Sequence, residues 1–251
     1  MDFTDKIVLV TGASRGIGRA CARMFAEHGA RVAVHYHASR AAAETTLAAL
    51  AGSGHLLVQA DIANPAEVQA MVSTVIEQMG GLHVLVNNAG IYEKRPVAGL
   101  TYEGWLDTWN KNIQTNLLGA ANAAFCAAQH MIAHGGGRIV NVSSRGAFRG
   151  EPDSPAYGAA KAGMNAMSQS LAKALAPYGI IVTAVAPGWV DTDMAAEHLA
   201  ERADEMRAQS PLERIARPEE VAYTVLFLAS EGVEFLTGAI VDINGASYLR
   251  T

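Results

Sequence analysis

The chain has little of what marks several large classes of protein. Its only cysteines are Cys21 and Cys126, both among apolar neighbours, which predicts free thiols in a reducing cytoplasm rather than a disulfide scaffold. No apolar run approaches the ~20 residues that span a bilayer, and the first ten residues, MDFTDKIVLV, do not resemble a signal peptide. No basic block is present and the net charge is −5. We therefore expect no membrane segment and no nucleic-acid partner.

Apolar residues, by contrast, make up 50% of the chain, enough for a large core. They form short runs rich in Val and Ile that do not alternate with polar residues, as is typical of strands buried on both faces of a parallel sheet. Helical spacing fills the intervals, and Asn64-Pro65 and Ser154-Pro155 each predict a helix start. We predict one α/β domain over residues 1–251, a Rossmann-like doubly wound parallel sheet of about seven strands with helices on both faces. The predicted strands are residues 6–10, 31–36, 55–60, 82–86, 138–142, 180–185 and 239–243.

A glycine-rich turn follows the first predicted strand and opens the first predicted helix. Residues 11–18 read TGASRGIG, with Gly12, Gly16 and Gly18 at the turn. Glycines there let backbone N–H groups approach a pyrophosphate, which rests at the helix N-terminus. The spacing departs from the standard G-x-G-x-x-G, so the pattern alone also fits a plain strand-to-helix turn. Its position favours a nucleotide site.

The end of the second predicted strand bears on which dinucleotide binds. In dinucleotide folds an acidic residue there favours NAD by accepting hydrogen bonds from the ribose. The place falls near Tyr36, without a carboxylate, whereas Arg15, Ser39 and Arg40 lie close by. Cations and a hydroxyl suit a 2′-phosphate, so the sequence favours NADP over NAD unless both arginines are only surface charges. Asp61, after the third predicted strand, either bonds the adenine amino group or belongs only to a turn.

The stretch SPAYGAAKAGM, residues 154–164, sets one phenol and one amine among small residues. Tyr157 and Lys161 are four positions apart, which places them on one face of a helix. An ammonium close to a phenol favours the phenolate and lowers its pKa, so we expect Tyr157 to serve as an acid or a base. Taken alone, the same pair also fits an incidental Tyr and Lys on a surface helix.

Five motifs occur along the chain in a recognisable order. They are TGASRGIG (11–18), NNAG (87–90), NVSS (141–144), YGAAK (157–161) and APG (186–188). With these motifs the chain resembles the short-chain dehydrogenase/reductase family over almost its whole length, and looks most like the 3-oxoacyl-[acyl-carrier-protein] reductase branch. The resemblance implies a catalytic tetrad of Asn116, Ser144, Tyr157 and Lys161, with Ser143 adjacent to the matching serine.

The resemblance also implies a cofactor and a reaction. Hydride passes directly between the nicotinamide C4 and a ketone or secondary alcohol, while Tyr157 supplies a proton, Ser144 holds the substrate oxygen, and Asn116 with Lys161 relays a replacement proton. The cofactor-binding residues it implies are Gly12, Ser14, Arg15, Gly16, Ile17, Gly18, Tyr36, Asp61, Ile62, Asn88, Ala89, Gly90, Tyr157, Lys161, Pro187, Gly188, Val190 and Thr192.

No metal is needed for this reaction. His130 and His134 form an i,i+4 pair, but no third ligand is in view, so we interpret them as a surface face. The polar, helical segment 191–220 is expected to form a lid over the substrate pocket. The resemblance also implies a homotetramer. The small apolar residues 119–128 suit helix association between chains, unless they belong to the chain's own core.

Three alternatives remain at this stage. A sugar or cyclic alcohol dehydrogenase of the same family fits the same motifs. A sugar-nucleotide epimerase shares the Tyr and Lys, but needs a further substrate domain. A cofactor-sensing protein would keep the fold without catalysis, although such relatives usually lack part of the tetrad.

The identity of the substrate carrier is a separate question. Carrier proteins are acidic, so their reductases offer basic docking patches. In this branch we expect such cations just before the fifth predicted strand and at the end of the helix that carries Tyr157. In these stretches, 130–140 and 173–180, only Arg138 and Lys173 are firm positive charges, and Tyr178 stands where an arginine is expected. Arg145 and Arg149 lie beyond Ser144 and either compensate in part or are only loop charges. We expect free ketones or short thioesters to be better substrates than carrier-bound ones.

Overall fold

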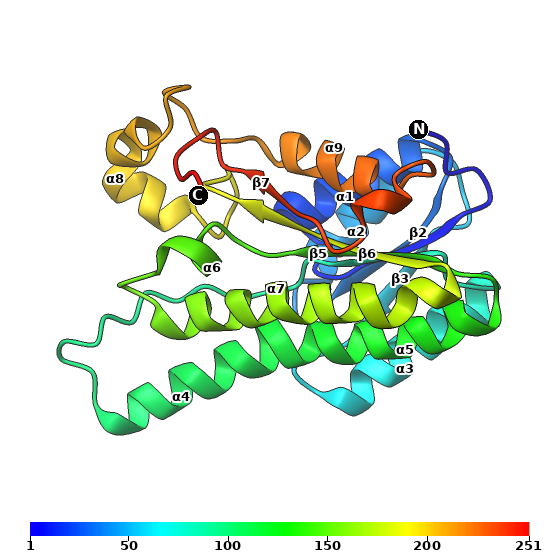
Figure 1. Ribbon diagram of the computed structural model, residues 1–251, viewed down its shortest axis with the longest axis horizontal. Helices are drawn as coiled ribbons and strands as arrows, with labels where there is room; N and C mark the ends of the chain where they lie inside the picture. Colours follow the sequence, from blue (N-terminus) through cyan, green and yellow to red (C-terminus); the bar gives the residue numbers. More distant parts are fainter. Residues whose placement is uncertain (251) are drawn as a thin grey trace.

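Seven parallel strands form one sheet at the centre of the computed structural model, which describes residues 1–250 and, for 197–201, only the backbone. The strand order is β3-β2-β1-β4-β5-β6-β7. Figure 1 shows the sheet lying between two layers of helices. The chain order reverses between β1 and β4, which is where doubly wound sheets bind ligands. The strands are β1 Ile7–Val10, β2 Arg31–Tyr36, β3 Leu56–Gln59, β4 Val84–Asn87, β5 Gly137–Val142, β6 Ile180–Pro187 and β7 Ile240–Ile243.

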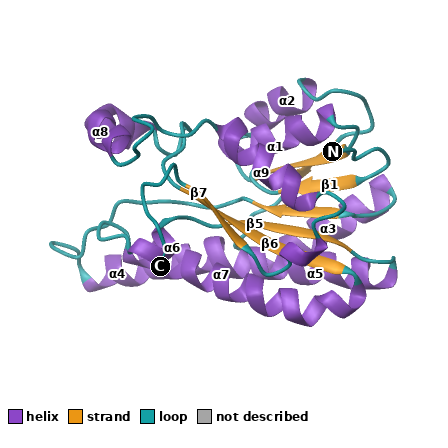
Figure 2. Ribbon diagram, turned by 45° about the horizontal axis from the view of Figure 1, so that its top comes forward, coloured by secondary structure: helices purple, strands orange, loops and turns teal. Residues whose placement is uncertain are grey.

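Helices cover both faces of this sheet (Figure 2). On one face α1 packs against α9, with α2 beside α1; on the other, α5 lies between α3 and α7, and α4 packs on α7. The predicted fold class and all seven predicted strands are confirmed. The helices are α1 Gly16–Glu27, α2 Arg40–Ala48, α3 Pro65–Met79, α4 Tyr102–Ile113, α5 Gly119–Ala133, α6 Gly146–Arg149, α7 Pro155–Leu175, α8 Ala196–Ala208 and α9 Pro218–Ala229, with short 3₁₀ turns at Ala176–Tyr178 and Glu234–Leu236.

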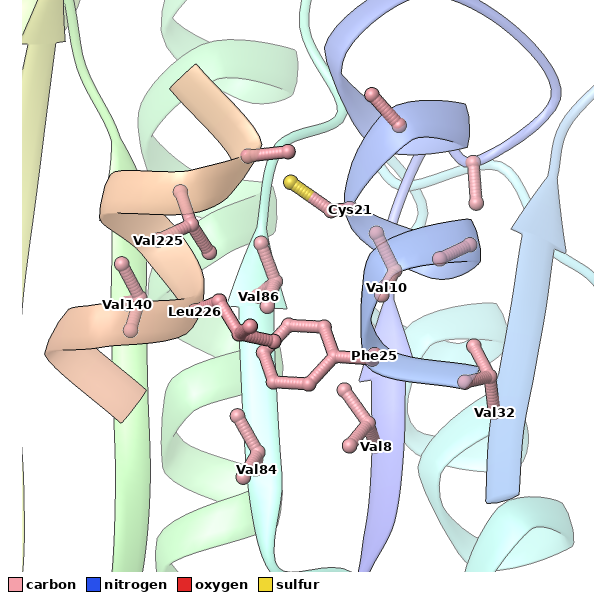
Figure 3. Packing of buried hydrophobic residues seen from close by; sticks show 14 of the residues in the cluster. Val8, Val10, Cys21, Phe25, Val32, Val84, Val86, Val140, Val225 and Leu226 are labelled. Carbon is pink, nitrogen blue, oxygen red and sulfur yellow. The ribbon is translucent and has the colours of Figure 1, made fainter. Parts of the chain in front are cut away.

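The lack of alternation in the strands reflects two apolar layers, one on each side of the sheet. In β1, Val8 and Val10 point into the layer under α1 and α9, where they meet Phe25 and Leu226 (Figure 3). The neighbouring Ile7 and Leu9 point the other way, into the layer under α3 and α5. Successive side chains of a strand face opposite sides, so a strand covered on both sides must be apolar throughout.

Local signals place the helix ends. Asn64 caps α3 by accepting hydrogen bonds from the backbone N–H groups of Ala66 and Glu67, and Pro65 takes the first helical position. Ser154 occupies the same position before α7, but its hydroxyl makes no capping bond. Between α4 and α5 the helix widens to a π-turn over Gln114–Leu118. Within residues 1–250, no helix combines the length and the apolarity needed to cross a bilayer.

Candidate active site

A cleft runs across the carboxyl ends of the central strands and adjoins a second cavity. The cleft has a volume of ≈ 720 Å³ and is lined by the glycine turn and by the ends of β2, β3 and β4. The second cavity is lined by Ser144, Tyr157 and Lys161. Ile17, Asn88, Gly90 and Thr192 line both spaces. Of the predicted site residues, Gly18 and Asn116 line neither and lie behind the surface.

The glycine turn has the shape that its residues require. Gly12 and Gly16 have φ values of +64° and +54°, in the left-handed region that favours glycine. Gly18 is needed for a different reason: a Cβ there would overlap the Gly12 carbonyl oxygen and lie 2.5 Å from Asn88 Nδ2. The turn is therefore packed directly against the end of β4, leaving its outer side to the cleft.

His35 supports this turn, and the sequence analysis did not single it out. The imidazole is buried and lines the cleft from the end of β2. Its Nδ1 accepts a hydrogen bond from the Gly12 N–H at 2.9 Å, so Nε2 carries the proton and donates to the Ala60 carbonyl oxygen at 3.0 Å. Burial lowers the pKa of His35 to about 4, which keeps the ring neutral and able to accept. A histidine inside a strand whose other inner residues are all apolar was the available signal.

Thr11 and Asn88 join the glycine turn to β4. The Thr11 hydroxyl accepts hydrogen bonds from the backbone N–H groups of Asn88 and Ala89 at 2.9 and 3.0 Å. The Asn88 side chain donates to the carbonyl oxygens of Thr11 and Gly12 at 2.8 and 3.1 Å. These bonds hold the two strand ends on which the cleft is built in a fixed relation.

The residues predicted to choose the dinucleotide divide into two groups. Tyr36, Ser39 and Arg15 line the cleft, and Arg15 Nε lies 3.8 Å from an Asp193 carboxylate oxygen, with both side chains more than half exposed. Arg40 does not line the cleft, because its guanidinium turns back to Glu44 at 2.8 Å. Its interpretation as a 2′-phosphate ligand has no support in this geometry, whereas Arg15 keeps that possibility.

Asp61 and Ile62 line the cleft below the end of β3. The Asp61 carboxylate accepts a hydrogen bond from the Ala63 N–H at 2.9 Å. This bond is the turn role considered from the sequence, and the residue that makes it also lines the cleft.

Ser144 and Tyr157 come from different elements and both line the second cavity. Ser144 follows β5, and its hydroxyl accepts a hydrogen bond from the Gly146 N–H at 3.0 Å, which fixes the side chain. Ser143 instead donates to the Lys161 carbonyl oxygen at 3.2 Å. Tyr157 lies in the first turn of α7, and its ring packs edge-on against Tyr92 with centroids 5.0 Å apart. The geometry thus separates the two serines as the motif does.

The electrostatics of Tyr157 and Lys161 differ from the sequence expectation. Lys161 Nζ donates to the Val142 carbonyl oxygen at 2.8 Å and lies 5.8 Å from the centroid of the Tyr157 ring. Burial raises the pKa of Tyr157 to about 12, and the Ser144 hydroxyl lowers it by less. Burial also lowers the pKa of Lys161 to about 8. The pKa of Tyr157 is thus shifted upward, against the lowering expected from the ammonium, because burial is the largest influence on it.

Asn116 sits in the π-turn and is fully buried. Its Oδ1 accepts from the Ile91 N–H at 2.8 Å, and its Nδ2 donates to the Ile91 carbonyl oxygen and to Asn112 Oδ1, each at 3.0 Å. A Cβ on Gly90 would lie 2.7 Å from Asn116 Oδ1 and 3.7 Å from Lys161 Nζ. Gly90 therefore stands between the asparagine and the lysine.

The end of β6 and the residues that follow it border the site. Pro187, Gly188 and Val190 line the second cavity, and Val190 forms a β-bridge with Ala216. The Thr192 methyl group approaches the glycine turn, where a Cβ on Gly16 would lie 3.1 Å from it. This segment thus contacts both the cleft and the cavity.

Comparison with known proteins agrees with this arrangement. A family model described as enoyl-(acyl carrier protein) reductase matches residues 12–246. The chain is 39% identical over 246 residues to a 3-oxoacyl-[acyl-carrier-protein] reductase FabG of Staphylococcus aureus, covering 97% of this chain and 98% of the relative. It is 41% identical over 245 residues to a cis-4-hydroxycyclohexanecarboxylate dehydrogenase of Sinomonas cyclohexanicum, covering 97% and 96%.

A solved structure is similar to this chain in both fold and sequence. The crystal structure of a short chain dehydrogenase from Burkholderia cenocepacia in complex with NADP has a TM-score of 0.89 and 34% identity, covering 98% of this chain and 99% of that one. Fold, site and relatives together define an oxidoreductase of the doubly wound α/β class. More narrowly, the chain belongs to the short-chain dehydrogenase/reductase family.

Proposed function

We propose that the protein is an NADPH-preferring oxidoreductase that interconverts a ketone and a secondary alcohol, in the manner of a 3-oxoacyl reductase. The observation that carries the proposal is the cavity in which Ser144, Tyr157 and Lys161 adjoin the cleft over the glycine turn. That arrangement supports the proposal, because a dinucleotide bound in the cleft would end beside a phenol able to donate a proton and a hydroxyl. The NADP-bound structural neighbour supports the choice of cofactor.

The residues present fit a nicotinamide dinucleotide. The glycine turn opens the N-terminus of α1 towards the cleft, as a pyrophosphate requires. Ile17, Asn88 and Gly90 line the passage from the cleft to the cavity, so a ligand spanning the two would pass over them. When bound, the cofactor supplies or accepts the hydride at its nicotinamide C4. We propose that Pro187, Gly188 and Val190 hold the nicotinamide end.

The chain's own part in the reaction is to hold the carbonyl oxygen and deliver a proton. With a pKa of about 12, Tyr157 keeps its proton at neutral pH and acts as the acid in the reduction direction. Its O–H bond breaks as a new O–H bond forms on the substrate oxygen, which the Ser144 hydroxyl steadies. Lys161, with its pKa lowered to about 8, then returns a proton to the phenolate. Asn116, held by Ile91 and Asn112, positions the relay beyond the lysine.

Arg15→Ala should weaken NADPH binding about 10-fold and leave NADH binding within about twofold, because only NADPH carries a 2′-phosphate for the guanidinium. Both affinities can be measured by quenching of protein fluorescence. Arg23→Ala is the matched control, since Arg23 is a half-exposed arginine of α1 that pairs with Glu27 instead of facing the cleft. Equal binding of the two cofactors, unchanged by Arg15→Ala, would contradict the proposed preference.

The substrate is better matched to a free small molecule than to a carrier protein. Arg138 pairs with Glu234 at 2.7 Å and Arg149 with Glu151 at 3.5 Å, so these cations are already neutralised. Tyr178 is exposed where we looked for an arginine, and the net charge of −5 repels an acidic carrier. A cyclic alcohol is the second candidate, favoured by the relative that acts on cis-4-hydroxycyclohexanecarboxylate.

The experiment that tests this function follows NADPH oxidation with one 3-oxoacyl chain on carrier protein and on a small thiol, and with cyclic ketones. We expect turnover, with kcat/KM higher for the small compounds. A preference for the carrier that fades as salt rises would show that a docking patch exists. Tight NADPH binding without oxidation of any ketone would favour the cofactor-sensing alternative.

We further propose a cytoplasmic homotetramer of single-domain chains in which residues 191–220 cover the pocket. The small residues of 119–128 support assembly less than expected, because Ala123, Ala124 and Ala127 are buried in the chain's own core. Exposed apolar side chains support assembly better: Phe125 on α5 is 64% exposed and Leu106 on α4 is 44% exposed. Light scattering should give about four times the 26.4 kDa of one chain; a monomer mass would contradict the proposal.

A further inference from the structure

Arg145 is the residue directly after Ser144, and it is buried where an arginine is seldom found. The residue retains 3% exposure and lines both the cavity that holds Ser144 and Tyr157 and a neighbouring cavity that Ser247 also lines. Nothing in the reaction described above uses it. Burying a charge is costly unless a partner compensates, so an arginine in this place needs an explanation.

The partners of Arg145 within the chain are neutral. Its two terminal nitrogens donate to the Ser247 hydroxyl and to Gln209 Oε1, the latter at 2.9 Å. In the part of the chain that the structure describes, no carboxylate lies within 4.0 Å of the guanidinium. A guanidinium has five N–H donors in a planar fork, and these two bonds leave part of the fork for a further acceptor.

The other charges of the cavity have a partner or a proposed role. Glu151 lines the same space, but its carboxylate lies 3.5 Å from Arg149 Nε. Lys161 donates to the Val142 carbonyl oxygen and belongs to the proposed proton relay. Burial lowers the pKa of Arg145 to about 10, which still leaves it charged at neutral pH. The described side chains provide no anion for either Lys161 or Arg145, and of these two cations only Arg145 has no part in the proposed reaction.

We propose that Arg145 is a specificity-determining residue that binds a carboxylate carried by the substrate. This inference rests on the proposed ketone and alcohol chemistry and narrows its substrate class to small oxo or hydroxy carboxylates. The planar fork of arginine matches a carboxylate, and the low dielectric of a buried site strengthens the pair. Because Arg145 and Ser144 line the same cavity, we assign the carboxylate and the reacting oxygen to one small molecule. The apolar wall provided by Trp189 and Met194 suits its carbon skeleton.

The test compares 4-oxocyclohexanecarboxylate with its methyl ester, using NADPH. Wild-type protein should have the higher kcat/KM for the carboxylate. Arg145→Gln should lower kcat/KM for the carboxylate about 10- to 100-fold, as expected for a lost charge-assisted bond, and change that for the ester less than about threefold. Arg145→Lys keeps the charge without the fork and should retain part of the preference. Arg138→Gln, at the opposite end of β5, is the matched control and should not alter the preference.

A second readout does not depend on turnover. Calorimetry should show that cyclohexanecarboxylate binds the wild-type protein with NADP more tightly than cyclohexanecarboxamide does, and that Arg145→Gln removes the difference. Equal losses on both ketones, or equal binding of acid and amide, would overturn the inference and leave Arg145 as a clamp between the β5 loop, α8 and the C-terminal segment. Absence of NADPH oxidation with any ketone, despite the binding difference, would refute the proposed function while the carboxylate site stands.

Discussion

Tyr157→Phe should lower kcat for ketone reduction about 10³-fold, which is the range expected when a general acid is removed. The phenylalanine ring fills the same space and keeps the edge-on contact with Tyr92, so the cavity should not collapse. What disappears is the O–H group that contacts Ser144 and that we propose as the proton donor to the substrate oxygen. The affinity for NADPH, measured on the same preparation, should change less than about threefold.

The comparison variant is Tyr178→Phe, which removes a hydroxyl from a half-exposed tyrosine beyond the end of α7. It should retain full activity. Retention of more than a few per cent of wild-type turnover in Tyr157→Phe would contradict the assignment of Tyr157 as the acid. A parallel loss of NADPH binding would instead indicate that the substitution disturbs the cleft.

Gly18→Ala should destabilise the fold by about 3 kcal/mol and abolish dinucleotide binding at micromolar concentration. Helix propensity alone predicts the opposite, a gain of about 1 kcal/mol for alanine over glycine within a helix. The Cβ, however, would overlap the Gly12 carbonyl oxygen and crowd Asn88 Nδ2, and both atoms are fixed by backbone geometry or hydrogen bonds. The turn would have to move away from β4.

Gly158→Ala is the matched control for stability, because Gly158 also lies in the first turns of a helix. A Cβ there would meet its nearest neighbour, the Gly146 carbonyl oxygen, at 3.5 Å, an ordinary contact. It should therefore show the gain of about 0.5–1 kcal/mol that propensity predicts. Denaturant unfolding measures both variants. A stable Gly18→Ala protein that binds NADPH normally would show that the glycine turn is looser than its packing indicates.

Much of the fold was predictable because the strands carry their environment in their composition. A strand such as Ile7–Val10, apolar at every position, has to be covered on both faces, and strand-helix alternation then leaves few topologies. The glycines at 12, 16 and 18 were equally readable, since backbone shape and close packing admit little else.

The direction of a side chain and its degree of desolvation could not be predicted from the sequence in the same way. Arg40 and Arg15 look equivalent in the sequence, yet one turns to Glu44 and the other lines the cleft. The spacing of Tyr157 and Lys161 was correct, but their pKa values depend on how far burial removes each from water. The role of His35 could not be predicted, because it depends on a hydrogen bond from the Gly12 N–H that only the structure shows.

The π-turn over Gln114–Leu118 has a consequence for how this chain tolerates changes of length. A π-turn holds one residue more than an α-helical turn, and each residue advances a helix by about 100°. Deleting one residue there would restore a regular helix, but it would also rotate α4 against α7 and withdraw Asn116 from Ile91. Insertions and deletions that surface loops accept are therefore excluded from this helix. The number of residues in this helix, as much as their types, sets where Asn116 lies relative to Ile91 and the active site.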